Sequence, residues 1–419
     1  MKALLLGADG FIGRQIAFDL RANGWDVIAC ARRTDRLAAM GFEVLQADLH
    51  DPATHQPAFW RAALAGGVHL INAAGLLTGD EAAFEAVHVA APLAARGALS
   101  GGRMVQISAV GIEGAQTPFA RWRRAAELAL AGEDITILRP GLVLGETSYG
   151  GSSLVRALAA MPVVTPVVGA GDQRFNPIHG ADLAEVVRAC LINPPAPGIW
   201  EIGGPEEITQ SGLIGAYRGW LGLRPARRLR IPVGVAHLIG RIGEALSLGP
   251  ISTTAVAQLE AGVLAAPKPL LAQIGARPRG VSAFIHARPA GTQDLWHARL
   301  YLLKPLIRFA LAALWIGSAL LGLLTPAAQI TAMVPALSEG AALALGRLFG
   351  LADLMIGLAL IANWRPKVWA QLQLVLVLGY TFGLGVIAPD LWADPIGGML
   401  KNIPILALIL AHLALIEER

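Results

Sequence analysis

The stretch GADGFIG, residues 7–13, decides the fold of the first part of the chain. It follows the apolar run KALLL and opens an amphipathic stretch that ends at Gly24, a residue placed to cap a helix. Glycines at this spacing between a strand and a helix suit a dinucleotide: Gly7 permits the tight turn, Gly10 lets the backbone approach a pyrophosphate, and Gly13 allows close helix–strand packing. The helix N-terminus adds free N–H groups and a positive dipole end. The expected contacts are Gly7, Ala8, Asp9, Gly10, Phe11, Ile12 and Gly13.

Downstream of this loop, apolar strand patterns alternate with helical ones. Strands are predicted at residues 2–6, 27–32, 43–47, 68–74, 104–108, 135–140 and near 198–202. Such alternation predicts an α/β fold, a Rossmann-type doubly wound parallel sheet. A small, mostly helical lobe is expected at about 205–290, so the first domain covers residues 1–295.

The end of the second strand indicates which dinucleotide binds. It reads ACARRTDR, with Arg32 and Arg33 where an acidic residue would hold the ribose 2′-hydroxyl of NAD. Guanidinium groups suit a 2′-phosphate, so NADP(H) is favoured, with NAD(H) and plain surface arginines as the alternatives. After the third strand, Asp48 and Leu49 are expected at the adenine end. The segment INAAG should pass the middle of the cofactor with Ala73, Ala74 and Gly75.

The last quarter of the chain has a different composition. The 419 residues are 54% hydrophobic and only 15% charged, and just eleven charged side chains follow Arg308. Apolar segments at 303–324, 341–362, 368–388 and 400–416 can each cross a ~30 Å hydrocarbon layer. We therefore predict an all-α four-helix transmembrane bundle over residues 303–419, in contact with membrane lipid.

Charge placement predicts how the bundle is oriented. Basic residues collect before the first span, between the second and third, and at the C-terminus, whereas the other two loops carry mainly acidic residues. By the positive-inside rule, both termini and the first domain face the cytoplasm of a multi-pass protein of a bacterial-type inner membrane. The first apolar run is too short for a signal peptide, and Cys30 and Cys190 are expected to be reduced. The net charge of +4, without a basic tract, argues against nucleic acid as a partner.

The motifs GADGFIG, INAAG, QISAVG and LRPGLVLG together resemble the extended and atypical short-chain dehydrogenase/reductase superfamily. The segment RFNPIHGADLAEVV is similar to the atypical branch that includes the NADPH-binding accessory subunit of respiratory complex I. The last quarter, from GTQDLWHARLYLLKP onward, resembles a DoxX-like four-helix membrane domain. The two resemblances cover nearly the whole chain and imply nicotinamide binding beside a membrane module.

The resemblance also implies a catalytic place that this chain fills unusually. In active members of the superfamily a Ser precedes a Tyr that exchanges a proton, and a Lys four residues later grips the nicotinamide ribose. Ser108 fits the Ser, but Phe119 occupies the Tyr place and Arg123 the Lys place. Phe119 has no hydroxyl, whereas Arg123 can still bind ribose hydroxyls. A relocated proton donor is sought in Tyr149 or, second, His179, each with a packing or structural role as the alternative.

Two main functions compete on these residues. The first is a membrane-anchored NADP(H)-dependent oxidoreductase or isomerase that acts on a lipophilic small molecule, a quinone or an isoprenoid. The second is a non-catalytic NADP(H) sensor or assembly subunit with a respiratory or membrane partner protein. A weaker third interpretation makes the four-helix part the active module. No metal site is expected. In the second span, Asp353 is costly unless paired, and a contact with His412 is expected.

Overall fold

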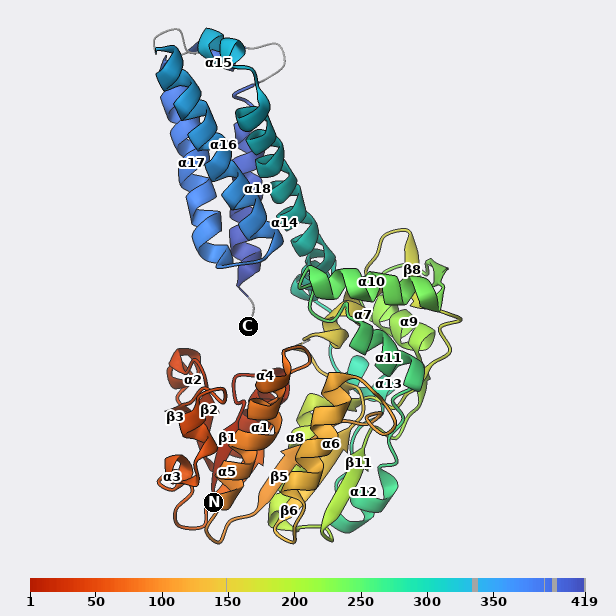
Figure 1. Cartoon of the computed structure of the whole chain (residues 1–419). Helices are drawn as coiled ribbons and strands as arrows, with labels where there is room; N and C mark the ends of the chain where they lie inside the picture. The colour runs from red at the N-terminus through yellow and green to blue at the C-terminus, as the bar shows by residue number, and fades with distance from the viewer. Residues whose placement is uncertain (148, 334–337, 388, 394–397, 418–419) are drawn as a thin grey trace. The chain divides into compact units, whose positions relative to one another are not determined.

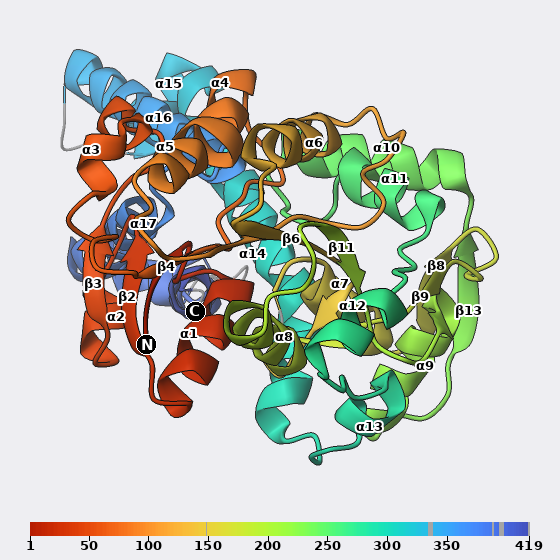
Figure 2. The ribbon, with the colours of Figure 1, turned by 90° about the horizontal axis from the view of Figure 1, so that it is seen from below.

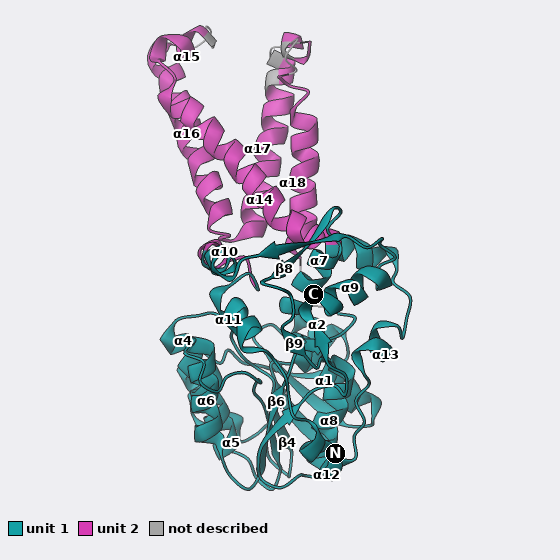
Figure 3. Ribbon diagram, turned by 90° about the vertical axis from the view of Figure 1, so that its right-hand side faces the viewer, with its two compact units in different colours: residues 1–241, 250–298 teal, residues 242–249, 299–419 magenta. Residues whose placement is uncertain are grey.

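The computed structural model describes residues 1–147, 149–333, 338–387, 389–393 and 398–417. The chain divides into two compact units, which Figure 1 and Figure 3 show. The first contains residues 1–241 and 250–298, and the second contains residues 242–249 and 299–419. Within the second unit, the backbone carbonyl of Leu246 accepts a hydrogen bond from Arg308 Nη2 at 2.7 Å.

A seven-stranded parallel sheet forms the centre of the first unit. Its order is β11-β6-β5-β4-β1-β2-β3, and every neighbouring pair is parallel. The strands are β1 (Lys2–Leu6), β2 (Asp26–Ala31), β3 (Glu43–Gln46), β4 (His69–Asn72), β5 (Met104–Ile107), β6 (Ile135–Pro140) and β11 (Gly198–Ile202). The order reverses between β1 and β4, where doubly wound sheets open a ligand crevice. The predicted fold class is confirmed.

Helices cover both faces of the sheet because alternate strand residues point to opposite sides. In β1, Ala3 and Leu5 pack with α1 and α8, whereas Leu4 and Leu6 pack with the opposite layer, around Trp60. Figure 2 shows α3, α5 and α6 on one side of the sheet and α1 and α8 on the other. The helices of this part are α1 (Phe11–Ala22), α2 (Asp35–Ala39), η1 (Pro52–His55), α3 (Pro57–Trp60), α4 (Glu81–Glu85), η2 (Ala86–Ala90), α5 (Ala91–Gly97), α6 (Pro118–Leu130) and α8 (Gly180–Ile192).

The lobe of the first unit is a mixture of helices and short strand pairs. Its sheets pair β10 with β7, β12 with β9, and β13 with β8, so segments from residues 143–179 and 208–231 build it together. Within residues 205–290 the lobe consists mainly of helices, and its two strands there pair with strands from residues 164–175. Its elements are β7 (Val143–Leu144), α7 (Gly151–Ala159), β8 (Val164–Val168), β9 (Arg174–Phe175), β10 (Ile178–His179), β12 (Ile208–Thr209), α9 (Gln210–Trp220), β13 (Arg227–Ile231), α10 (Val233–Ala245), α11 (Thr253–Ala261), α12 (Lys268–Ile274) and α13 (Val281–Ile285).

The second unit is a bundle of long apolar helices. They are α14 (Thr292–Leu324), α15 (Ala327–Met333), α16 (Glu339–Ile361), α17 (Pro366–Ile387), η3 (Pro389–Trp392) and α18 (Asn402–Ile416). Within the described residues, α14 and α16 are long and apolar enough to cross a membrane, and α18 is a shorter apolar helix. The first of these helices begins eleven residues before the predicted span. Small residues let α14 and α16 approach closely: a Cβ on Gly322 would lie 2.9 Å from Gly350 Cα.

The expected contact between Asp353 and His412 is wrong. Asp353 Oδ2 accepts a hydrogen bond of 2.6 Å from Ser318 Oγ, while both ring nitrogens of His412 lack a partner. The reason is depth. Asn402 Nδ2 donates to Thr381 Oγ1, so α18 begins beside Thr381, six residues before the end of α17. At ~1.5 Å per residue, His412 then lies about 15 Å from Thr381 toward the Lys367 end of α17. Asp353 lies only about 6 Å in that direction from Tyr380, because it is four residues beyond Phe349, which contacts the Tyr380 ring.

Candidate functional site

The loop after β1 has the geometry that a phosphate-binding turn requires. Gly7 has a φ of +74°, and a Cβ there would lie 2.8 Å from Ala74 Cα. A Cβ on Gly13 would overlap the carbonyl oxygen of Gly7, so α1 can pack this closely only through glycine. Gly10 is the N-cap of α1 and offers no side-chain cap, which leaves the first N–H groups of the helix available to an anion.

The side chains expected at the adenine end lie at the same edge of the sheet. Arg32 and Arg33 directly follow β2 and are exposed. Asp48, two residues beyond β3, accepts hydrogen bonds from the ring and the backbone N–H of His50, which lower its pKa; the charge of Arg32 acts in the same direction. Leu49 is buried, so its backbone and not its side chain can border a ligand.

After β4, the side chain of Arg123 lies against Gly75, the last residue of the INAAG segment. A Cβ on Gly75 would overlap the Arg123 guanidinium, so a larger residue there would displace this side chain. Arg123 is buried on α6 and donates from Nη1 to the backbone oxygen of Ile107 at 2.5 Å, while its Nε has no partner. Burial lowers the pKa of Arg123 to about 10, and the charge of Glu127 opposes this shift. Arg123 therefore stays cationic at neutral pH.

Ser108 is held by a buried ion pair that the sequence motif does not include. Its Oγ donates to Glu127 Oε1 at 2.5 Å, and Glu127 also accepts two hydrogen bonds from Arg139, at 2.8 and 2.5 Å. Glu113 completes the group with a 2.7 Å bridge to Arg139. Because the Ser108 hydroxyl donates its hydrogen bond to Glu127, its oxygen can only accept hydrogen bonds from other groups.

Phe119 belongs to a small apolar cluster with Phe84, Ile112 and Ala120. His88 lies beside it, with ring centroids 6.4 Å apart, on the single-turn π-helix η2. Its Nε2 accepts the backbone N–H of Leu76 at 3.0 Å. Burial first, and then the charge of Arg123, lowers the pKa of His88 to about 3, so its ring is neutral at physiological pH. π-helical turns of this kind occur frequently at functional sites.

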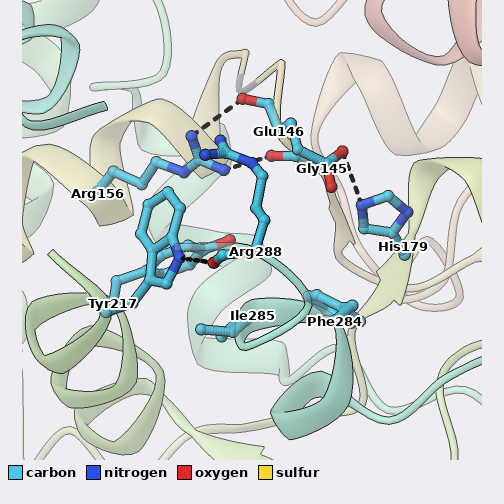
Figure 4. Close-up of a pocket in the computed structure, with 9 residues that line it drawn as sticks. Gly145, Glu146, Arg156, His179, Tyr217, Phe284, Ile285 and Arg288 are labelled. Carbon is cyan, nitrogen blue, oxygen red and sulfur yellow. Dashed lines mark hydrogen bonds and ion pairs between the residues drawn. The ribbon is translucent and has the colours of Figure 1, made fainter. Parts of the chain in front are cut away.

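A small pocket lies in the lobe, as Figure 4 shows. It is lined by Gly145, Glu146, Arg156, His179, Tyr217, Trp220, Phe284, Ile285 and Arg288. The guanidinium groups of Arg156 and Arg288 lie 5.2 and 5.1 Å from the Trp220 ring, at cation–π distances. Arg156 donates to the backbone oxygens of Gly145 and Glu146, but its buried Nε has no partner.

The pocket borders the phosphate loop. A Cβ on Gly145 would lie 3.5 Å from the Phe11 ring, and Gln15 of α1 donates to Thr147 Oγ1 at 3.2 Å. Residues 145–147 thus lie between the start of α1 and the arginines that line the pocket. A ligand on the loop and a second ligand in the pocket would be neighbours.

His179 caps helix α8 at one wall of this pocket. Its Nδ1 accepts from the Ala181 N–H at 3.2 Å and from Arg279 Nη2 at 2.9 Å, which assigns the ring proton to Nε2. That Nε2 faces Glu146 Oε2 at 3.1 Å. The hydrogen bond lowers the pKa of Glu146 to about 2 against the opposing effect of burial. His179 is therefore committed on both nitrogens.

Tyr149 stands apart from these groups. Its ring is 62% exposed at the start of α7, and its backbone N–H and carbonyl both bond the Ser152 hydroxyl. The structure thus gathers the glycine loop, Ala73 to Gly75, Ser108, Phe119 and Arg123 around the ends of β1, β4 and β5. No described contact joins Tyr149 to Phe119 or Arg123. Among the described residues, no group of three or more His, Cys, Asp or Glu side chains could hold a metal ion.

A doubly wound sheet with a glycine loop at its switch point defines a dinucleotide-binding domain. Residues 3–203 match the NAD dependent epimerase/dehydratase family, and residues 312–410 match the DoxX-like family. The chain therefore joins an NAD dependent epimerase/dehydratase-family domain to a DoxX-like domain, and both resemblances are confirmed at this level. The DoxX-like domain and the two long apolar helices mark a membrane protein. No curated protein matches the chain.

Solved structures share the fold of the first domain. UDP-glucose 4-epimerase of Thermus thermophilus, in complex with NAD, is 22% identical, with 71% of this chain and 99% of that one covered and a TM-score of 0.52. UDP-glucuronic acid 4-epimerase of Bacillus cereus, in complex with UDP-glucuronic acid and NAD, is 14% identical, with the same coverage and the same TM-score. At these identities the likeness concerns the fold alone.

Sequence reasoning missed Glu127, Arg139 and His88. The sequence pattern could have indicated Glu127, because Phe119, Arg123 and Glu127 are spaced four residues apart and so share one face of α6. A lone histidine in the apolar run AVHVAAPLAA gives no such signal. The pocket arginines lie 132 residues apart in the chain, and only the folded lobe brings them together.

Proposed function

We propose that this chain is a membrane-bound oxidoreductase that binds NADP(H) and exchanges a hydride with a lipophilic substrate of the quinone or isoprenoid class. The observation that carries the proposal is the contact between the glycine loop and the lobe pocket through residues 145–147. This contact would set a second ligand beside a dinucleotide bound at the loop. Arg156 would bind an oxygen acceptor at the polar end of that substrate, since its Nε still has a hydrogen to donate, whereas Arg288 is held by Asp294 at 2.7 and 2.8 Å.

In this arrangement the chain's own residues hold the cofactor. The N-terminus of α1 would face the pyrophosphate, and Arg123 would bind the nicotinamide ribose from its place against Gly75. The cofactor supplies the hydride. Ser108 would accept a hydrogen bond from a substrate hydroxyl, because its own proton already goes to Glu127.

A second candidate function is a non-catalytic NADP(H) sensor or assembly subunit. The specific observation in its favour is Phe119, which fills the usual proton-donor place and is buried among apolar side chains. In that case the cofactor would be a structural ligand, and a respiratory or membrane protein would be the partner. Hydride transfer decides between the two candidates, because only the first one consumes NADPH.

The deciding experiment measures NADPH oxidation by the full-length protein in detergent with decylubiquinone as the acceptor. We expect turnover, and we expect Tyr149→Phe to reduce it by roughly 100-fold with unchanged NADPH affinity if the exposed phenol donates the proton. Phe119→Leu is the matched control, because it exchanges one apolar side chain for another at the usual donor place. Tight NADPH binding without turnover would favour the sensor, and full turnover in Tyr149→Phe would eliminate this tyrosine as the donor.

The cofactor preference has its own test. Replacing both Arg32 and Arg33 by Ala should weaken NADPH binding by about 1–3 kcal/mol, since charge-assisted hydrogen bonds to the 2′-phosphate would be lost. NADH binding should barely change. Isothermal titration calorimetry on the two nucleotides measures both effects, with Arg36→Ala as an exposed control a few residues further on. Tighter binding of NADH than of NADPH by the unmodified protein would contradict the preference.

We also propose a topology with four spans and both termini in the cytoplasm. A cysteine introduced at position 390 should then be labelled by a membrane-impermeant maleimide in intact cells, whereas one at position 366 should be labelled only after lysis. Asp394, in the same outer loop, lies outside the described residues. Cys30 and Cys190 are buried and should not react. The reverse labelling pattern would refute the orientation.

A further inference from the structure

The interior of the helix bundle contains buried polar groups that the chain itself does not satisfy. His412 is only 2% exposed, and neither of its ring nitrogens has a hydrogen-bond partner. Trp369 Nε1 and Arg308 Nε are also buried without partners. An unsatisfied buried polar group costs about 1–3 kcal/mol. Asp353 Oδ1 is a fourth such atom, although Asp353 Oδ2 is bonded to Ser318 on another part of the bundle. The three side chains without this kind of support, His412, Trp369 and Arg308, therefore require an explanation.

Two contacts place these groups at one level of the bundle. The antiparallel helices α17 and α18 are joined by Asn402 to Thr381 at one end and by Glu417 to Lys367 at the other, at 2.9 and 2.5 Å. Counting ten residues from Asn402 sets His412 opposite residue 371, between Trp369 and Gln373. Ile307, next to Arg308 on α14, packs against the same apolar cluster as Trp369, so α14 borders this part of the bundle.

On the side away from Lys367, the unsatisfied groups border a hydrogen-bonded pair formed by Trp315 and Gln373. Gln373 is fully buried; it accepts a 2.9 Å hydrogen bond from Trp315 Nε1 and donates to the backbone oxygen of Trp369. An apolar cluster that includes Leu311, Ile356, Leu360, Val377 and Ile409 lies beside these groups, and Trp369 packs against it. The unsatisfied groups therefore lie between a satisfied Trp–Gln pair and the end of the bundle that carries Lys367 and Glu417.

The chemistry of the unsatisfied atoms indicates the ligand. A neutral imidazole has one N–H donor and one acceptor, whereas the Trp369 indole and the Arg308 Nε are donors only. The unsatisfied atoms therefore comprise three N–H donors and one acceptor nitrogen, and the Arg308 guanidinium adds a positive charge. A ligand rich in oxygen acceptors satisfies this set better than the chain's own hydroxyls do, and an apolar tail suits the cluster beside it.

We infer that the bundle binds the polar head of an amphiphile, with His412, Trp369 and Arg308 donating hydrogen bonds to carbonyl or carboxylate oxygens. The tail lies along the apolar cluster around Ile409. This site belongs to the second unit alone, and the inference does not rest on hydride transfer by the first domain.

The experiment uses the full-length protein in phosphatidylcholine nanodiscs without nicotinamide nucleotide. Isothermal titration calorimetry follows decylubiquinone, whose head offers neutral carbonyls, and dodecanoate, whose head is a carboxylate. We expect at least one of the two probes to bind saturably. Comparing the two titrations shows whether the site takes a neutral carbonyl head or a carboxylate head. Decylbenzene, which has the tail without the oxygens, should not bind saturably.

Three variants test the donors. Trp369→Phe removes the indole N–H and should weaken binding about 5-fold, and His412→Leu should weaken it about 10-fold or more. His412→Gln keeps donor and acceptor capacity and should remain within about 3-fold of the unmodified protein. Leu410→Val, at an exposed position of α18 two residues earlier, is the packing control and should bind normally. If His412→Leu does not fold, Trp369→Phe and His412→Gln decide the question. Equal binding by Trp369→Phe and the unmodified protein, or saturable binding of decylbenzene, would overturn the site.

Discussion

Gly13→Ala is expected to abolish dinucleotide binding by the first domain. The added Cβ would overlap the carbonyl oxygen of Gly7, a backbone atom of the phosphate loop, so no side-chain movement can relieve the clash. Overpacking typically costs about 1–3 kcal/mol even where side chains can adjust. Here α1 must move away from the ligand it should contact, and we expect at least about 100-fold weaker NADPH binding, since about 1.4 kcal/mol corresponds to a factor of ten.

The measurement is an NADPH titration of the full-length protein, together with its melting temperature. Gly215→Ala in α9 is the matched control, because a Cβ there meets nothing within 4 Å. It should bind NADPH normally. If Gly13→Ala binds NADPH within about 2-fold of the unmodified protein, the loop does not hold the pyrophosphate, and the proposed function loses its cofactor site.

The fold of the first domain could be predicted because its signals are local. The strand ending at Leu6, the glycine loop and the amphipathic helix that follows it lie within the first 24 residues. Each later strand repeats the same apolar pattern. The lobe was harder, because β13 pairs with β8 across about 60 residues, and no local pattern encodes such a pairing. Its arginine-containing pocket could not be foreseen for the same reason.

The error at Asp353 has a different origin. Residue counts along two helices give depths only if both helices begin at the same level, and the bond from Asn402 to Thr381 shows that α18 begins lower. Similarly, the motif at Ser108, Phe119 and Arg123 indicated which residues gather, but not where the Ser108 proton goes. That direction depends on Glu127, whose own position is fixed by Arg139 on the neighbouring strand β6.

Glu127→Ala is expected to destabilise the first domain strongly. Glu127 is 3% exposed and pairs with Arg139 through two hydrogen bonds, which raise the pKa of Arg139. Removing one partner of a buried pair costs about 3–5 kcal/mol, and the exposed Glu113, which still pairs with Arg139, should keep the loss near the lower end of this range. For a domain of this size the melting temperature should fall by roughly 6–10 °C. The control is Glu81→Ala, which breaks an exposed ion pair with Arg121 of α6 and should leave the melting temperature nearly unchanged.

The double variant Glu127→Leu with Arg139→Met separates stability from chemistry. With both charges gone and the volume kept, most of the lost stability should return, since apolar replacements of buried pairs are often neutral or better. The Ser108 hydroxyl would then have lost its acceptor and could present its own hydrogen to a substrate. If Glu127 only anchors α6 to β6, NADPH turnover should return together with the melting temperature. If Glu127 orients the Ser108 proton for the reaction, the double variant should melt normally and stay inactive. A double variant that is no more stable than Glu127→Ala would show that the ion pair itself, and not the unpaired charge left behind, holds this part of the domain together.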